Sequence, residues 1–476
     1  MKKTNWRWYL CALLFVATTV NYLDRQVLSL TWKEFIAPEF HWTDENYGDI
    51  TAAFSLIYAV ASICAGKFID WMGTRKGYLW AIGIWSLGAC LHAGCGWATV
   101  HCGQFEGVST VAELGRATGD TIVAIATLSV YFFIFCRTVL AIGEAGNFPA
   151  AIKVTAEYFP KKDRAFATSI FNAGASIGAL IAPITIPSLA AKYGWEMAFI
   201  IIGGLGFFWM FFWAYMYDTP DKSKHVNEAE LEYINQDSQE EVKTTSAVGE
   251  KTIPLLKCLT YKQTWAFLAG KFFTDGVWWF FLFWAPAYFQ DQFGYKTSDP
   301  MGQALIFTLY AIVTVVSIGG GYMPKYFVEK KGMEPYAGRM RAMLLFAFFP
   351  IFTLFAQDLG TTSAWWPAVI IGFACAGHQA WSANLYSTIG DMFPKSTVAT
   401  ITGIGTLAGG AGSAIVTNVA GKLFKWSAMQ GEAFSLFGFE GKAAGYMIVF
   451  CYCAVAYLLA WSIMKTLVPR YKKIDV

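Results

Sequence analysis

The chain has 476 residues, of which 14% are charged and 56% belong to the hydrophobic set AVILMFWYC. Soluble domains contain about 25% charged residues, so this composition excludes a disordered chain and an ordinary soluble enzyme. The formal net charge is only +3 and no long basic run occurs, which excludes a nucleic-acid partner.

The apolar residues form twelve long stretches separated by short polar breaks. Each stretch approaches the roughly 20 residues that a helix needs to cross the hydrocarbon core of a bilayer, and none alternates as a barrel strand does. The sequence therefore predicts an all-α membrane protein with twelve transmembrane helices in two six-helix bundles. The predicted spans are approximately 8–33, 48–70, 77–98, 126–148, 165–190, 197–217, 264–290, 302–324, 341–357, 364–386, 397–420 and 444–468.

Lysine and arginine accumulate in the short cytoplasmic loops of membrane proteins. If both termini are cytoplasmic, the loops on that side carry 19 Lys and Arg residues, with the central loop left out, and the opposite loops carry 7. Both termini are therefore expected in the cytoplasm. The first helix lacks a small-residue cleavage site, so we expect it to be retained rather than removed as a signal peptide.

A polar stretch, 218–262, divides the chain into a first bundle (1–217) and a second bundle (263–476), and reads as a cytoplasmic linker. The halves resemble each other, since Phe-Pro-Lys at 159–161 recurs at 393–395 and small-residue-rich helices follow both. Gly174 with Gly178, and Gly405 with Gly409, form small-xxx-small patterns that favour close helix packing.

Charges within the predicted spans are costly in lipid and therefore form the default functional hypothesis. Asp24 and Arg25 are adjacent in the first helix, where Tyr22 shares a face with Arg25. A self-neutralised structural pair is the alternative. Arg137 and Glu144 share a face of the fourth helix but lie about 10 Å apart, so each needs a partner on another helix. Asp24 and Arg25 are the candidates, and a buried carboxylate whose cation is drawn away by an anion would bind a proton.

Two further helices carry clustered polar residues. Lys271 and Asp275 are four residues apart, which permits an ion pair within the seventh helix, and Trp278 follows within a turn. His378, Trp381 and Ser382 can line one surface of the tenth helix. Burying an unpaired polar group in lipid costs free energy, so the polar residues of these helices imply a ligand or a water-filled cavity. Gln379 and Asn384 on the same helix and the pair Asn172 and Ser176 on the fifth complete the polar set.

The ten cysteines show no metal-ligand spacing, and the sequence holds no phosphate loop or activated nucleophile, so neither a metal, a cofactor nor an enzymatic activity is expected. Cys95 and Cys102 lie near the outer end of the third helix, where a disulfide is one alternative and free thiols are the other. The long loop 99–125 suggests no function.

The loop GKFIDWMGTRKG resembles the signature of the major facilitator superfamily, GxxxD(R/K)xGR(R/K). Gly66, Asp70, Gly73 and Arg75 match it, whereas Trp71 replaces the usual basic residue. The resemblance implies that Asp70 and Arg75 form a charge latch on the cytoplasmic side. The corresponding stretch of the second half, GGGYMPKYFVEKKG, lacks the acidic residue.

More closely, the chain resembles the anion:cation symporter family and its bacterial hexuronate transporters. The resemblance rests on NYLDR, GEAGNFPAAIKVTAEYFPKKDRA, FNAGASIGALIAP, GWEMAFII and FACAGHQAWSAN. It implies proton-responsive carboxyls at Asp24 and Glu144 and a substrate carboxylate on Arg25. Sugar contacts are implied for Tyr22, Tyr58, Asn172, His378, Gln379, Trp381 and Asn384. Ala175 stands where an aldonate-carrying branch has glutamine, which favours a uronate.

The sequence thus predicts a secondary transporter of the bacterial inner membrane. It would import glucuronate or galacturonate by proton symport through alternating access, and act as a monomer. The alternatives are a transporter of another organic anion, such as an aldonate, a tricarboxylate-like acid or an amide-linked sugar, and a transporter-like sensor of sugar acids. The linker is too short for a signalling domain, which argues against the sensor.

Overall fold

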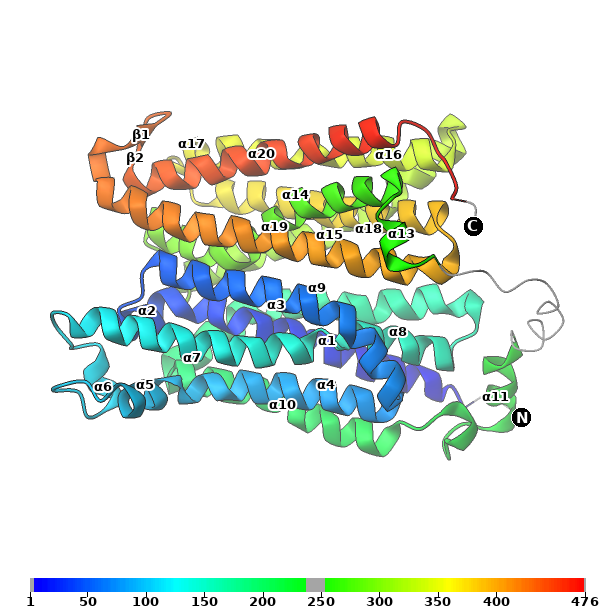
Figure 1. Cartoon of the computed structure of the whole chain (residues 1–476), viewed down its shortest axis with the longest axis horizontal. Helices are drawn as coiled ribbons and strands as arrows, with labels where there is room; N and C mark the ends of the chain where they lie inside the picture. Colours follow the sequence, from blue (N-terminus) through cyan, green and yellow to red (C-terminus); the bar gives the residue numbers. More distant parts are fainter. Residues whose placement is uncertain (1–3, 237–252, 475–476) are drawn as a thin grey trace.

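The computed structural model describes residues 4–236 and 253–474, and over these residues the chain is almost entirely helical (Figure 1). Twelve long helices, some continued by short ones, follow the predicted spans closely, which confirms the predicted fold. The first half contains α1 (Trp6–Thr31), α2 (Ala37–Phe40), α3 (Asp44–Met72), α4 (Thr74–Leu91), α5 (Cys95–Gly103), α6 (Val111–Leu114), α7 (Thr121–Glu144), α8 (Asn147–Tyr158), α9 (Lys161–Tyr193) and α10 (Trp195–Met216).

The second half repeats this pattern and adds one small β-hairpin. It contains α13 (Leu255–Cys258), α14 (Lys262–Phe293), α15 (Pro300–Lys331), α16 (Pro335–Ala347), α17 (Ala356–Gly360), α18 (Trp365–Met392), α19 (Lys395–Gln430), β1 (Ser435–Leu436), β2 (Phe439–Glu440) and α20 (Gly441–Leu467). Short helical turns at η1 (Trp32–Ile36), η2 (His92–Gly94), η3 (Pro220–Lys222), η4 (Phe349–Phe355) and η5 (Gly431–Ala433) join the longer helices.

Eight of the described helices are both long and apolar enough to cross a membrane by composition alone. The other four long helices are α1, α14, α18 and α19. Three of these, α1, α14 and α18, carry most of the candidate site residues. Their lower hydropathy is the consequence of the buried polar side chains, because those side chains displace leucines and isoleucines from the span.

Both chain termini lie at the same end of the helices, called here the terminal end; the opposite one is the distal end (Figure 1). The helices of the first half lie together on one side of the molecule and those of the second half on the other. Gly178 lets α9 approach α1, because a Cβ there would meet Thr19 O at 2.7 Å. Gly73 has φ +77 between α3 and α4, a conformation that glycine adopts without strain.

At the distal end, four charged side chains join the two halves. Lys33 Nζ lies 3.1 Å from both Asp44 Oδ1 and Asp291 Oδ1. Lys442 Nζ lies 2.7 Å from Asp44 Oδ2 and 2.6 Å from Asp291 Oδ2. We call Lys33, Asp44, Asp291 and Lys442 the distal quartet. Each half contributes one lysine and one aspartate to it, and Tyr446 donates a hydrogen bond to Asp291 at 2.9 Å.

More cross-half contacts surround the quartet. Lys425 pairs with Glu45 at 2.6 Å, and Asn418 donates to Asp49 at 2.5 Å. The Tyr47 hydroxyl donates to Phe283 O at 2.9 Å. All of these residues lie in the distal half of the molecule, so the two halves are fastened together at that end.

The first part of the linker folds against the start of α1. Asn227 caps α11 (Glu228–Ile234), as its sequence predicts, by accepting a hydrogen bond from Glu230 N at 2.9 Å. The Glu230 side chain is fully buried, pairs with Arg7 at 3.0 Å, and accepts hydrogen bonds from Trp6 N and Thr4 Oγ1. Residues 237–252 of the linker lie outside the described residues.

The alternative of a Cys95–Cys102 disulfide is wrong. Cys102 is exposed, Cys95 is buried, and both are free thiols. The Cys95 sulfur lies 3.7 Å from that of Cys136 on α7 instead. The loop 99–125 is not irregular throughout, because it holds the end of α5 and the single-turn α6.

Candidate functional site

A buried ion pair between α1 and α7 forms the centre of the first half. Arg25 donates to Glu144 Oε2 from Nε at 2.9 Å and from Nη2 at 2.7 Å. Both residues are almost completely buried. Glu144 is the last residue of α7, where the chain turns into α8, and this position directs its carboxylate towards α1. The expectation that Glu144 finds its partner on the first helix is confirmed.

The Asp24 carboxylate is the most isolated charge of this centre. It is buried, and neither oxygen has a hydrogen-bond partner among the described residues. Trp85 Nε1 lies close to it without meeting hydrogen-bond geometry, and Glu144 and Arg137 lie within electrostatic range. A carboxylate so poorly solvated is a strong candidate to exchange a proton.

Arg137 and Arg25 both lie near the ring of Phe54. The guanidinium of Arg137 is 5.3 Å from the ring centroid of Phe54, and that of Arg25 is 5.7 Å from it. Arg137 is buried and its Nη1 has no partner among the described residues. Arg137 therefore balances the two carboxylates of the centre without a direct contact to either, which agrees with a structural role for its charge.

Aromatic rings enclose the Arg25 guanidinium. The ring centroids of Tyr58, Trp279 and Tyr22 lie 4.7, 4.9 and 5.2 Å from its central carbon. Cation–π contacts of this length stabilise a desolvated guanidinium. Tyr22 and Tyr58 were expected at this site. Trp279 was not expected, because its neighbour Trp278 was the predicted binding residue. Trp279 contacts Arg25 from the second half of the chain.

A second ion pair lies in the second half. Lys271 Nζ is 2.6 Å from Asp275 Oδ2, so the pair that the four-residue spacing permits is present. Lys271 also lies 5.0 Å from the ring centroid of Tyr386 on α18. Both charged residues are buried, and Asp275 Oδ1 has no partner among the described residues. The long helices of each half thus contribute a buried cation–carboxylate pair.

The polar residues of α18 pack partly against one another. His378 Nδ1 lies 2.8 Å from the Tyr457 hydroxyl, and Trp381 packs edge-on to the same tyrosine at 5.5 Å between ring centroids. Trp278 stacks on the His378 ring at 5.3 Å. The structure therefore brings His378, Trp381 and Trp278 together, as part of one aromatic cluster around Tyr457.

The remaining predicted contact residues are more scattered. Asn384 is buried, and its Nδ2 donates to Ala380 O at 2.8 Å. It also lines a cavity of about 360 Å³ between α15, α16 and α18, together with Lys325 and Arg339. Gln379 and Ser176 are half-buried, and Asn172 is exposed, so these three are not enclosed in either charged centre.

The charges of the signature loop do not pair with each other in this structure. Asp70 accepts from Lys153 Nζ at 2.7 Å, and Arg75 pairs with Asp218 at 3.2 Å and donates to Ala214 O. The expected Asp70–Arg75 pair is therefore absent; Asp70 pairs within the first bundle and Arg75 pairs with the first residue of the linker. A Cβ at Gly66 would meet nothing within 4 Å, so close packing does not explain that glycine here.

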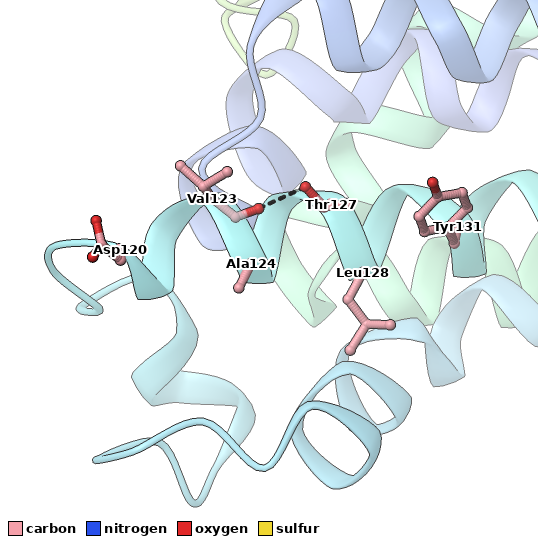
Figure 2. A pocket seen from close by; sticks show the side chains of 6 residues that line it. All are labelled: Asp120, Val123, Ala124, Thr127, Leu128 and Tyr131. Atoms are coloured by element: carbon pink, nitrogen blue, oxygen red, sulfur yellow. Dashed lines mark hydrogen bonds between the residues drawn. The ribbon is translucent and has the colours of Figure 1, made fainter.

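A separate cavity of about 560 Å³ follows one face of α7 near the distal end (Figure 2). Val123 and Tyr131 on this face are 68% and 66% exposed. All of the side chains that line it come from α7 or the residue just before it: Asp120, Val123, Ala124, Thr127, Leu128 and Tyr131. It is a groove on the outer surface of the bundle, apart from both ion pairs.

Comparison with known proteins identifies relatives of most of the chain. The family model described as Major Facilitator Superfamily matches residues 14–417. The hexuronate transporter of Escherichia coli (strain K12) is 28% identical over 426 residues, which cover 88% of this chain and 87% of that protein. The galacturonate transporter of Dickeya chrysanthemi is 27% identical over 323 residues, or 67% of this chain and 82% of that one.

The solved structures show the same fold. A bacterial homolog of the human lysosomal transporter Spinster, in an inward-facing and occupied conformation, superposes with a TM-score of 0.67 at 18% identity, covering 97% of both chains. The D-xylose-proton symporter superposes with a TM-score of 0.66 at 15% identity, covering 95% of this chain and 97% of that one.

Proposed function

Because the chain belongs to the Major Facilitator Superfamily and is therefore a multi-pass membrane transporter rather than an enzyme, we propose that it imports a hexuronate, glucuronate or galacturonate, by proton symport. Its similarity to transporters of sugar acids supports this substrate class. The observation that carries the proposal is the buried pair of Arg25 and Glu144 beside Asp24, whose carboxylate has no hydrogen-bond partner among the described residues.

The chemistry of the proposal follows from charge balance. The planar guanidinium of Arg25 can bind a carboxylate through two parallel hydrogen bonds. A uronate that takes over Arg25 removes the counterion of Glu144, and the buried carboxylate then favours its protonated form. Binding of the anion and binding of the proton therefore reinforce each other, and deprotonation restores the Arg25–Glu144 pair and expels the sugar acid.

The direction of transport follows from the orientation in the membrane. The terminal end would face the cytoplasm, in agreement with the excess of basic residues in the loops at that end. The distal quartet would then close the outer side in this structure. The protein would lie in a bacterial inner membrane and act as a monomer, since each charged centre is complete within one chain.

The proposal is tested by uptake of labelled glucuronate and galacturonate into proteoliposomes. We expect accumulation when the outside is made acidic relative to the inside, and its loss when a protonophore collapses the gradient. Uptake that ignores an imposed proton gradient would contradict symport, and absence of counterflow would contradict a carrier altogether.

Two variants separate substrate binding from proton coupling. Arg25→Ala is expected to reduce binding by at least about 100-fold, because a charge-assisted bidentate contact is lost. Glu144→Gln is expected to retain binding and counterflow but to lose proton-driven accumulation. Accumulation that survives in Glu144→Gln refutes its role in coupling, and thermal unfolding of both variants controls for misfolding.

A second candidate is transport of another organic anion, such as an aldonate. Gln379 and Ser176 are half-buried and Asn172 is exposed, so not all of the residues expected to contact the sugar ring are enclosed in a charged centre, which favours this second candidate. Competition of labelled uronate uptake by gluconate, galactonate and citrate distinguishes the two candidates.

A further inference from the structure

The Lys271–Asp275 pair has one charge-bearing atom that the protein leaves unused. Asp275 Oδ2 pairs with Lys271, but Oδ1 is buried and accepts no hydrogen bond from any described residue. Leaving a buried carboxylate oxygen without a donor costs free energy, so such an atom is retained where something else supplies the donor. A hydroxyl group of a bound sugar is a donor of the required kind.

Asp275 lies on the same helix, α14, as the tryptophan that covers Arg25. Trp279, which covers the Arg25 guanidinium at 4.9 Å, follows Asp275 by four residues. Four residues advance about 6 Å along a helix and return to within about 40° of the same face. Asp275 therefore lies about 6 Å along α14 from the residue that covers Arg25, and close to the same face of that helix.

The packing around Asp275 restrains its carboxylate. A Cβ at Gly409 on α19 would overlap Asp275 Oδ2, so that glycine makes room for the ion pair. On α20, Tyr452 and Tyr457 lie within electrostatic range of Asp275. Their hydroxyls donate to Phe273 O at 2.9 Å and Thr274 O at 3.3 Å.

Two side chains of α18 interact with Lys271. Tyr386 lies under its ammonium group, and His378 is within electrostatic range of it. With both tyrosines of α20 committed to backbone carbonyls, Lys271 is the direct partner of the carboxylate, and it holds Oδ2 in place while Oδ1 stays available.

We infer that Asp275 is a specificity-determining residue, which accepts a hydrogen bond from one ring hydroxyl of the sugar acid while Arg25 binds the carboxylate. Lys271 acts as a positioning residue that fixes the orientation of Asp275. This inference rests on the proposed function and deepens it, because it assigns the second half the task of reading hydroxyl configuration. No proton transfer is assigned to Asp275.

The test is a double-mutant cycle between the protein and its ligand. Dissociation constants are measured by calorimetry on the purified full chain for glucuronate, galacturonate and the 2-, 3- and 4-deoxy glucuronates. Asp275→Asn is expected to weaken binding of the parent sugar acid about 10- to 100-fold, the range for a hydrogen bond to a charged group. One deoxy analogue should show a comparable loss in the wild type and no further loss in Asp275→Asn.

The matched control is Glu432→Gln, which neutralises an exposed carboxyl of the same half and should change none of these constants. If Asp275→Asn fails to fold, Asp275→Glu keeps the charge but displaces the oxygen, and it should alter the ratio of glucuronate to galacturonate affinity.

Three results would overturn the inference. Equal losses for all analogues in Asp275→Asn would indicate a merely structural pair. A changed ratio of protons to sugar acid without coupling to any hydroxyl would make Asp275 a proton carrier. Unchanged affinities would leave it without a role at the site. A wild-type protein that binds neither uronate would contradict the proposed function itself. This outcome differs from the three results above, which contradict only the role of Asp275.

Discussion

The guanidinium of Arg25 contacts side chains from both halves of the molecule, and only part of this environment can be read from the sequence. Buried charges are rare enough in the chain that Arg25 and Glu144 stand out as partners. Trp278 and Trp279 are equally hydrophobic neighbours that point about 100° apart on α14. Which of the two faces Arg25 depends on the rotation of α14 against α1, and no local pattern specifies that rotation.

Glu39, a carboxyl outside the membrane-spanning helices, should make the stability of the protein depend on pH. Burial in α2 raises the pKa of Glu39 to about 7, although the hydrogen bond that it accepts from Trp195 Nε1 at 2.8 Å acts in the opposite direction. The pKa in the folded protein is thus above the unfolded value of about 4.3. Protonated Glu39 therefore makes its full contribution to the free energy of unfolding below about pH 4.3. This contribution is lost as the pH rises through about 7.

We expect the Tm of the wild type to decline by a few degrees between about pH 5 and pH 8, and Glu39→Gln to flatten this decline. Thermal unfolding across this range measures it, with Glu106→Gln as the control because Glu106 is exposed. If the Tm of Glu39→Gln declines as much as that of the wild type, groups other than Glu39 cause the decline.

At the scale of the elements, the Glu230 side chain of α11 binds the start of α1. Glu230 neutralises Arg7 and satisfies backbone N–H groups at the start of α1, which have no partners within the helix. The sequence indicates the cap of α11 but not this contact, since 223 residues separate Arg7 from Glu230.

Glu230→Ala is expected to lower the free energy of unfolding by about 3 kcal/mol, because it leaves Arg7 buried without its partner. Transport should be affected less than stability, since both charged centres lie elsewhere. Glu228→Ala on the exposed face of the same helix is the matched control. Equal Tm values for the two variants in thermal unfolding would show that the buried pair contributes nothing.

Helix boundaries were predictable to within a few residues at most ends, because hydropathy and the membrane thickness act on each helix alone. Apart from the Arg25–Glu144 pair, the contacts between elements were not predictable in this way. The signature loop indicated an Asp70–Arg75 latch, yet these residues pair with Lys153 and Asp218. These pairings depend on how α3, α4, α8 and the start of the linker pack together, which the local sequence of the loop does not specify.

At the scale of the whole molecule, the distal quartet holds the two halves together. Asp291→Asn leaves two lysines facing a single carboxylate, whereas the double variant Asp291→Asn with Lys442→Met removes one acid and one base from the same half. Both changes delete cross-half ion pairs, so both should shift the conformational equilibrium towards opening at the distal end. Only the single variant leaves an unbalanced charge, and it should lower the Tm more.

Spin-label distances between the distal ends of α3 and α19 measure this shift, with thermal unfolding measured in parallel. Lys325→Met, an exposed residue at the other end of the molecule, is the control. Distances that stay unchanged in both variants would show that apolar packing alone closes the distal end.

The pairing within the distal quartet also bears on membrane voltage. Lys33 is already bonded to Asp44 in its own half, and Lys442 to Asp291 in its own. When the halves separate, each therefore keeps a neutral pair, and no net charge crosses the field. Since electrical work is proportional to the charge displaced, separation of the quartet itself moves no net charge across the membrane field. Any dependence of transport on membrane potential then arises from charges other than those of the quartet.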